Sequence, residues 1–303
     1  MDRPIGVLGV PMDLGADRRG VDMGPSAIRY AGLVEELHDI GYDCRDHGDL
    51  RVPRPEGRDP DSTPPDDGHA KYLAETRDVC QRLGEAVADI VDNGAFPLVL
   101  GGDHSIAVGS VAGAARDRRT GVVWFDAHAD FNTPTTTPSG NVHGMPLAAI
   151  LGADSFAGSD WADVPTVDAE NVALVGVRSV DETEREALLD SDVTVYTMSD
   201  IDARGVTTVV EDALSVATDG TDAVHVSLDL DWLDPGEAPG VGTPVRGGVS
   251  YREAHAAMER LAAPEVPMRS MELVEVNPIL DDHNATAELA AELAASALGK
   301  RVL

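Results

Sequence analysis

The chain has 303 residues, an ordinary apolar content of 43% and a formal net charge of −31, from 54 acidic residues against 23 basic ones. The apolar content excludes disorder on compositional grounds, and the length suits one sizeable α/β domain. The acidic balance excludes nucleic-acid binding, which needs a basic surface. The acids are spread along the whole chain, so we interpret them as an adaptation to high salt, where screening over roughly 3 Å at 1 M suppresses self-repulsion.

The sequence also bears on the compartment. Two cysteines, Cys44 and Cys80, are too few for a disulfide framework. The N-terminus lacks the charged and apolar pattern of a signal peptide, and no apolar stretch has the length needed to cross a bilayer. We therefore expect a soluble cytoplasmic protein without a membrane partner.

In chain order, short β-branched apolar runs alternate with longer amphipathic stretches, a pattern that predicts a mostly parallel sheet covered by helices. The predicted strands are 5–10, 96–100, 122–126, 172–177, 193–196, 224–229 and 270–276. The predicted helices are 25–40, 70–92, 104–117, 182–190, 206–217, 251–262 and 285–299. Segments 53–68 and 153–168 are predicted surface loops. No linker interrupts the pattern, so residues 1–303 are expected to form one domain.

Three of the predicted strands end in carboxylates and imidazoles. The groups are His104 after the first, Asp126, His128 and Asp130 after the second, and Asp229 and Asp231 after the third. A spacing of two projects each set to one side of extended backbone, and the carboxyl ends of parallel strands share one edge of a sheet. Such a cluster would repel itself without cations, and two divalent ions balance four aspartates. Oxygen ligands with a minority of imidazoles favour manganese over cobalt, iron or zinc.

Several neighbouring motifs have more than one interpretation. Gly101 and Gly102, which precede His104, are not a phosphate loop because no Gly-Lys-Ser/Thr follows; we expect them to permit a sharp turn. Glu275 lies in an apolar run, where it is either paired with an arginine of the fold or a bidentate partner for a planar cation such as guanidinium. His225, inside a predicted strand, is interpreted as a satisfied core histidine.

The polar segment 132–143 is either a solvated turn or a loop that holds a carboxylate through hydroxyl and amide groups. His143 at its end is, taken alone, equally compatible with a surface histidine and a functional one. The segment directly follows the predicted metal ligands, which favours the functional interpretation.

The motifs together resemble the ureohydrolase family, and within it the arginases, along nearly the whole chain. The resemblance rests on segments 9–15, 19–29, 101–105, 126–130, 227–235, 242–248 and 275–278. It implies a three-layer α/β/α sandwich around a mostly parallel sheet and a binuclear manganese centre, two Mn²⁺ per subunit. The ligands implied by the motifs are His104, Asp126, His128, Asp130, Asp229 and Asp231.

The resemblance also implies how a substrate is held. Asn132 and Ser139 would bind an α-carboxylate, Asp181 and Glu184 would address an α-ammonium group, and Glu275 would align a guanidinium. The implied reaction is hydrolysis of L-arginine to L-ornithine and urea, by attack of a metal-bridging hydroxide on the guanidinium carbon.

Two residues are the candidates for moving protons in that reaction. Asp130 would pass a proton to the departing nitrogen, and His143 would relay protons between the site and solvent. Ser179 departs from the family pattern, since many arginases have an acid there, and this puts only water contacts at the ammonium in doubt.

Family members assemble as trimers or hexamers, so a homo-oligomer is expected, with Arg252 and Glu253 where relatives form subunit ion pairs. Three alternatives remain: a hydrolase of agmatine or another guanidino compound, a binuclear metallophosphatase, and a metal-dependent binding or regulatory protein. The phosphatase is disfavoured because acids, not cations, dominate the site segments.

Overall fold

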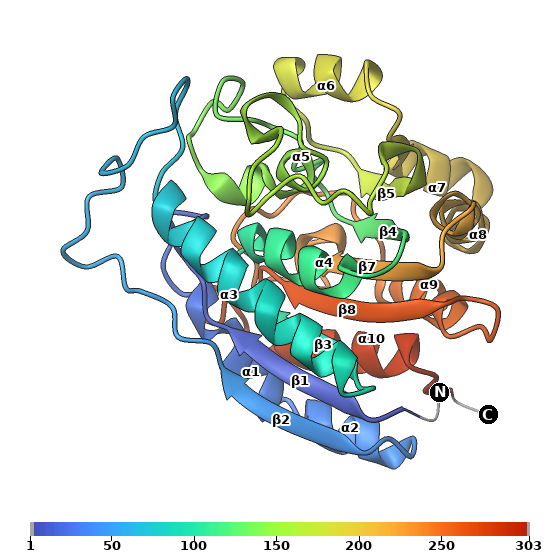
Figure 1. The fold of residues 1–303 in the computed structure, drawn as a ribbon. Helices are drawn as coiled ribbons and strands as arrows, with labels where there is room; N and C mark the ends of the chain where they lie inside the picture. The colour runs from blue at the N-terminus through green and yellow to red at the C-terminus, as the bar shows by residue number, and fades with distance from the viewer. Residues whose placement is uncertain (1–2, 302–303) are drawn as a thin grey trace.

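The computed structural model describes residues 3–301, in which one eight-stranded sheet forms the centre of the molecule (Figure 1). The strands are β1 (Ile5–Val10), β2 (Cys44–Asp49), β3 (Phe96–Gly101), β4 (Thr120–Phe125), β5 (Val172–Val177), β6 (Thr194–Thr197), β7 (Ala223–Asp229) and β8 (Met268–Val274). They are ordered β2-β1-β3-β8-β7-β4-β5-β6. Every strand pairing of this sheet is parallel, which confirms the predicted fold class.

Helices cover both faces of the sheet, giving three layers (Figure 1). On one face, α3 (Leu73–Asp92), α4 (Ala107–Ala115) and α5 (Pro146–Ile150) pack against residues such as Val122 and Trp124. The other face carries α1 (Gly24–Tyr30), α2 (Leu33–Asp39), α7 (Met198–Arg204), α8 (Val206–Thr218), α9 (Tyr251–Leu261) and α10 (Ala285–Ala297). Val123 and Phe125 point to that second layer, since successive side chains of a strand alternate between faces. The short α6 (Glu182–Leu189) lies beyond the carboxyl end of β5.

The structure departs from the predicted elements in a few places. The predicted helix 25–40 is divided into α1 and α2 because Gly32 adopts a left-handed conformation, with φ 85°. Strand β2 escaped prediction because its sequence, CRDHGD, contains no apolar run; it lies at the sheet edge, where charged residues discourage pairing with another chain.

Two helices were also missed. Helix α7 has a capping box between Thr197 and Asp200 that could have revealed it, whereas α5 has only five residues. The predicted loop 53–68 contains neither helix nor strand, and 153–168 contains a single short 3-10 turn, Asp154–Phe156.

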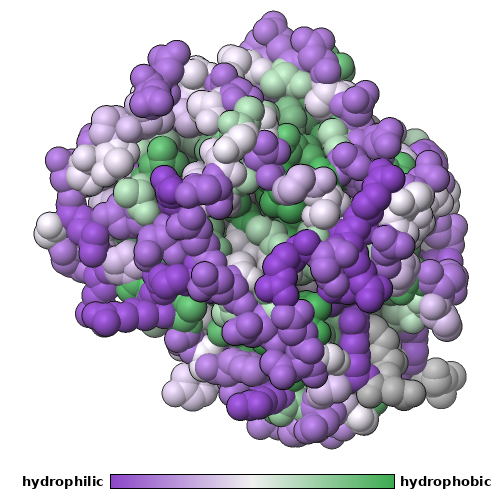
Figure 2. All heavy atoms as spheres, viewed as in Figure 1, coloured by the Kyte–Doolittle hydropathy of each residue, from purple (hydrophilic) through white to green (hydrophobic). Residues whose placement is uncertain are grey.

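The connectivity of the sheet decides which strand ends become neighbours. β3 and β4 follow each other in the sequence but are separated in the sheet by β8 and β7. The carboxyl ends of β3, β8, β7 and β4 are consequently adjacent, in the type of position where open α/β sheets bind ligands. No helix among the described residues is both long and apolar enough to span a membrane. The face of the molecule in Figure 2 is mostly hydrophilic, with apolar residues visible only in smaller areas between the polar ones.

Candidate metal centre and substrate pocket

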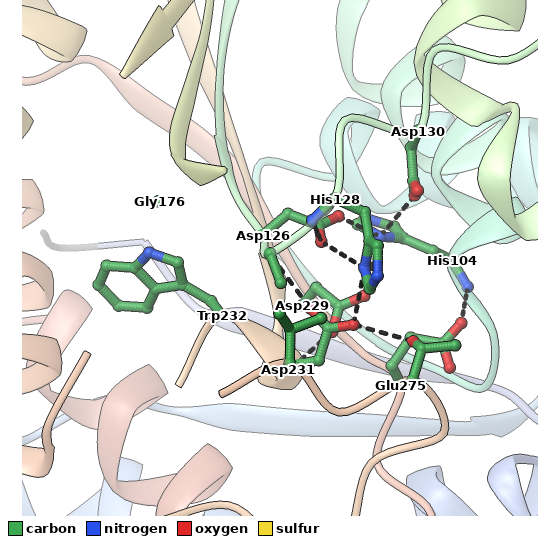
Figure 3. A network of polar contacts seen from close by, with 12 residues as sticks. His104, Asp126, His128, Asp130, Gly176, Asp229, Asp231, Trp232 and Glu275 are labelled. Carbon is green, nitrogen blue, oxygen red and sulfur yellow. Dashed lines mark hydrogen bonds and ion pairs between the residues drawn. The ribbon is translucent and has the colours of Figure 1, made fainter. Parts of the chain in front are cut away.

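The predicted ligand residues converge at the carboxyl edge of these four strands, as Figure 3 shows. His104 follows β3, Asp126 to Asp130 follow β4, and Asp229 and Asp231 lie at the end of β7 and just beyond it. Glu275 follows β8, the strand between β3 and β7. The structure therefore brings together all six predicted ligands and Glu275 from separate parts of the chain.

His104 lies at the centre of the first group of donors. Its Nδ1 is 3.3 Å from Asp126 Oδ2, 3.1 Å from Asp130 Oδ2 and 3.2 Å from Asp229 Oδ2. The ring is buried, and this nitrogen has no hydrogen-bond partner among the described residues. Burial would lower the pKa of His104, but the three carboxylates outweigh it and hold the pKa well above its usual value. Positive charge is strongly stabilised at this point, which is what a cation site requires.

His128 is the centre of a second group. Its Nδ1 is 3.0 Å from Asp231 Oδ2 and 3.5 Å from Asp126 Oδ1. Burial opposes the charged ring, yet Asp231 and Asp126 raise the pKa of His128 to about 12. Asp126 thus offers one oxygen to each group, and the two groups form a double site that could hold metal ions.

The carboxylates of this site repel one another electrostatically. Burial, followed by the neighbouring charges of Asp231 and Asp126, raises the pKa of Asp229 well above its usual value. The pKa of Asp231 is raised by the same causes, burial first and then Asp126. The donors are therefore hard carboxylate oxygens with one imidazole in each group, in need of positive charge. This donor set fits divalent cations, and Nδ1 of His104, which makes no regular hydrogen bond to the described residues, points at the three carboxylates with which it would share an ion.

Close backbone packing holds the ligand loops. A Cβ atom on Gly102 would lie 1.9 Å from the carbonyl oxygen of Met12, so only glycine fits beside the segment that follows β1. The chain does bend at 102–103, but neither Gly101 nor Gly102 has a positive φ, so the close approach of Met12 is what requires glycine at 102. Asp130 and Glu275 do have positive φ values, 51° and 66°, a strained conformation that is common at functional sites.

A cavity of about 230 Å³ opens onto the two donor groups. Its lining includes His104, His128, Asp130, Asn132, His143, Ser179, Asp181, Glu184, Asp229 and Thr243. Acidic side chains face it and, among the described residues, no lysine or arginine lines it, which suits a cationic ligand. A larger cavity of about 820 Å³ between α3, α4 and residues 159–166 contains none of the predicted site residues. We take the smaller one as the functional pocket because the reactive groups line it.

Of the predicted substrate residues, Asn132, Asp181 and Glu184 line the pocket and Ser139 does not. Asn132 and Asp181 line the pocket and are bonded to each other, Nδ2 donating to Oδ2 at 2.9 Å. Buried Glu184 accepts the N–H of Phe131 at 2.9 Å, and its pKa is raised to about 7, mainly by burial. Ser139 is exposed and outside the lining, and its Oγ accepts the N–H of Asn141 at 3.1 Å.

His143 and Glu275 form a pair at the side of the pocket. His143 Nδ1 lies 3.0 Å from Glu275 Oε1, which also accepts the backbone N–H of His104 at 3.0 Å. Burial would lower the pKa of His143, but Glu275 and then Asp130 raise it to about 9. His143 lines the pocket, whereas Glu275 is buried beside it and is not among the lining residues. The partner of Glu275 is thus a histidine, and not an arginine of the fold.

Several supporting residues were missed by the sequence analysis. The indole N–H of Trp124 donates to Asp126 at 3.0 Å, and the hydroxyl of Thr243 donates to Asp231 at 2.9 Å. Arg178 donates to the carbonyl groups of residues 231–233 and 245, and so ties the end of β5 to the loop after β7. The one feature of the sequence that could have indicated a role for Arg178 is its position directly after an apolar run.

Comparison with known proteins agrees with this site. Residues 3–299 match the model of the arginase family. The chain is 48% identical to arginase from Bacillus caldovelox over 99% of this chain and 100% of the relative, and 49% identical to arginase from Bacillus subtilis over the full length of both. The crystal structure of the Bacillus caldovelox arginase superposes with a TM-score of 0.92 at 48% identity, covering 99% of this chain and 100% of that one.

The fold and the site define a parallel α/β protein with a carboxylate- and imidazole-rich site that could hold metal ions at its carboxyl edge. The chain belongs to the arginase family, and the resemblance seen in the sequence is confirmed.

Proposed function

We propose that this protein is an arginase that hydrolyses L-arginine to L-ornithine and urea with two Mn²⁺ ions per subunit. The observation that carries the proposal is the pair of donor groups sharing Asp126 at the base of an acidic pocket. Full-length similarity to proteins named arginase supports the choice of substrate.

The residues that would hold the ions are those of the two groups. His104, Asp130 and Asp229 belong to one, His128 and Asp231 to the other, and Asp126 is common to both. When bound, divalent cations supply Lewis acidity, which lowers the pKa of a water molecule toward neutrality and so provides a nucleophile. Manganese is favoured because the donors are mostly hard oxygens.

The pocket would position arginine by charge. Asp181 and Glu184 lie on its wall and would attract the α-ammonium group, while Asn132 would offer its amide to the α-carboxylate. The Asn132 amide now donates to Asp181, so binding of a carboxylate would exchange one hydrogen bond for another. Glu275 would orient the guanidinium so that its carbon faces the nucleophile. Ser139, exposed in this structure, is retained only as a candidate contact at the outer end.

Two side chains would transfer protons during the reaction. Asp130 would pass a proton to the departing nitrogen; in the metal-free protein its pKa is raised to about 6, chiefly by burial and then by Asp126. His143, kept protonated by Glu275, would deliver a proton to the departing amine and recover it from solvent.

A hydrolase of agmatine or another guanidino compound is the main competitor, because the same metals and pocket base would serve it. The test is urea release from L-arginine, agmatine and guanidinobutyrate by the protein after manganese activation at high salt. We expect turnover of arginine to dominate. Preference for agmatine would remove the roles given to Asn132, whereas metal binding without urea from any substrate would favour a binding or regulatory protein.

Other properties of the protein are proposed as well. We infer one catalytic domain over residues 1–303, supported by a sheet that draws strands from 5 to 274. The resemblance supports a trimeric or hexameric homo-oligomer, the low cysteine content supports a cytoplasmic location, and the charge of −31 supports adaptation to salt. Arg252 is exposed and available for a subunit ion pair, whereas the carboxylate of Glu253 already accepts the N–H of Ser250 at 2.8 Å in a helix cap.

A further inference from the structure

A buried polar layer lies beneath the metal centre, between the two central strands and α4. On the face of β7 that packs against α8 to α10, the residues are Val224, Val226 and Leu228, all apolar. The opposite face of the same strand carries His225 and Ser227, and the matching positions of β8 carry Ser270 and Glu272. All four are 0–1% exposed. Central parallel strands are normally apolar on both faces, and burying such groups costs stability, so this layer needs a reason.

The layer is organised around the carboxylate of Glu272. The hydroxyl of Ser110, from α4, donates to Oε2. Oε1 has no hydrogen-bond partner among the described residues, and it lies 3.6 Å from His225 Nε2 and 4.0 Å from His104 Nε2. Ser270 Oγ contacts His225 Nδ1 at 2.8 Å and fixes that ring. The histidine expected to be satisfied in the core therefore directs one nitrogen at a buried carboxylate.

This carboxylate lies on the side of the His104 ring that faces away from the metal site. His104 Nδ1 faces the three aspartates, while Nε2 is 2.7 Å from Ser227 Oγ. The ring is further held by stacking on Trp124, with centroids 4.3 Å apart. A histidine that binds a metal through Nδ1 must keep its proton on Nε2. Ser227 Oγ is the acceptor within hydrogen-bond distance of that proton, and the Glu272 carboxylate, 4.0 Å from Nε2, places a negative charge behind it.

We propose that Glu272, held by His225 and Ser110, is a positioning residue for His104. Its buried negative charge, together with the Ser227 hydroxyl that contacts Nε2, favours the proton on Nε2 and leaves Nδ1 available to one of the two ions. The inference rests on the proposed function, because it assumes that His104 is a metal ligand. It assigns a purpose to the polar layer, since Glu272 and His225 do not line the substrate pocket.

The test is Mn²⁺ affinity of Glu272→Gln, which keeps the size of the side chain and removes its charge. Metal-free full-length protein is titrated with Mn²⁺ against a chelating indicator at high salt, and the unfolding of the metal-free form is measured by urea denaturation. We expect one of two binding steps to weaken about 10–100-fold, the usual effect of removing an outer partner of a metal-bound histidine. Glu272→Asp, which retains the charge, is expected to recover most of that loss.

Each outcome separates the possibilities. If wild-type protein binds no Mn²⁺, the proposed function fails. If it binds two ions and Glu272→Gln binds them equally well, whatever its unfolding free energy, only the positioning role is overturned. Should Glu272→Gln not fold, Ser227→Ala removes the hydroxyl in contact with His104 Nε2; weaker binding at one step is expected, and unchanged affinity would count against the inference.

Discussion

Gly176→Ala is the change that most directly tests how the loop after β7 is held. Gly176 lies within β5 with φ 96°, and a Cβ atom there would lie 2.2 Å from Nε1 of Trp232. Figure 3 shows Trp232 in the loop that carries Asp231, beside Gly176 and away from the ligand cluster. The indole is buried, packs edge-on against Phe125 at 4.8 Å, and cannot move aside freely.

The magnitude has two parts. A left-handed conformation costs a residue with a side chain about 1–2 kcal/mol, and overpacking of a full core costs about 1–3 kcal/mol. The free energy of unfolding of Gly176→Ala is therefore expected to fall by roughly 2–5 kcal/mol. Because displacing Trp232 also displaces Asp231, Mn²⁺ binding is expected to weaken about tenfold or more.

Gly41→Ala is the matched control. Gly41 has φ 91°, but a Cβ atom there would meet nothing within 4 Å. It carries the conformational penalty alone, about 1–2 kcal/mol, and leaves the metal site untouched. Both variants are compared with wild type by urea denaturation of the metal-free protein, followed by tryptophan fluorescence, and by Mn²⁺ titration. Equal losses of stability in the two variants, with metal affinity unchanged in both, would refute the reasoning.

Three further outcomes are expected. The pKa of His143 rises from 6.5 in the unfolded chain to about 9 in the folded one, so its pairing with Glu275 stabilises the metal-free protein fully below pH 6.5. This contribution, on the order of 3 kcal/mol, is lost as pH rises through 9. Urea denaturation measured against pH should show the loss in wild type and not in His143→Gln, and parallel profiles would contradict the prediction. Asp181→Ala should mainly raise KM for arginine in steady-state assays, and a change confined to kcat would speak against contact with the ammonium group. With a net charge of −31, wild-type protein should melt at a lower temperature in dilute buffer than at 1 M salt, whereas an unchanged melting temperature would exclude the proposed salt adaptation.

The sequence predicted the reactive chemistry because that chemistry is encoded locally. The residue types of Asp126, His128 and Asp130 indicated the donors, but the expected extended backbone was wrong, because the chain bends at 127–128 and Asp130 has φ 51°. The fold, and not a spacing of two, brings these side chains together. Apolar runs identified the buried strands because they too are local. Strand β2 was missed, since an edge strand needs no apolar sequence, and Gly32 interrupts a helix whose apolar spacing continues across it.

The supporting contacts could not be predicted in the same way. In the sequence, Trp124 and Thr243 look like an ordinary core residue and an ordinary loop residue. Only the fold brings their polar atoms to Asp126 and Asp231. Ser139 belongs to a motif of the family, yet its position on the exposed side of its loop depends on how residues 132–143 fold back. Such roles depend on distances between segments that lie far apart in the chain.

By itself, the sequence determined the type of fold, the donor atoms and the family, because these depend on residue identity and short-range spacing. Only the tertiary structure decided that β8 and β7 lie between β3 and β4, which brings His104, Asp229 and Glu275 beside Asp126. It alone placed Glu272 and His225 behind His104, since register between parallel strands is set by packing and not by local sequence.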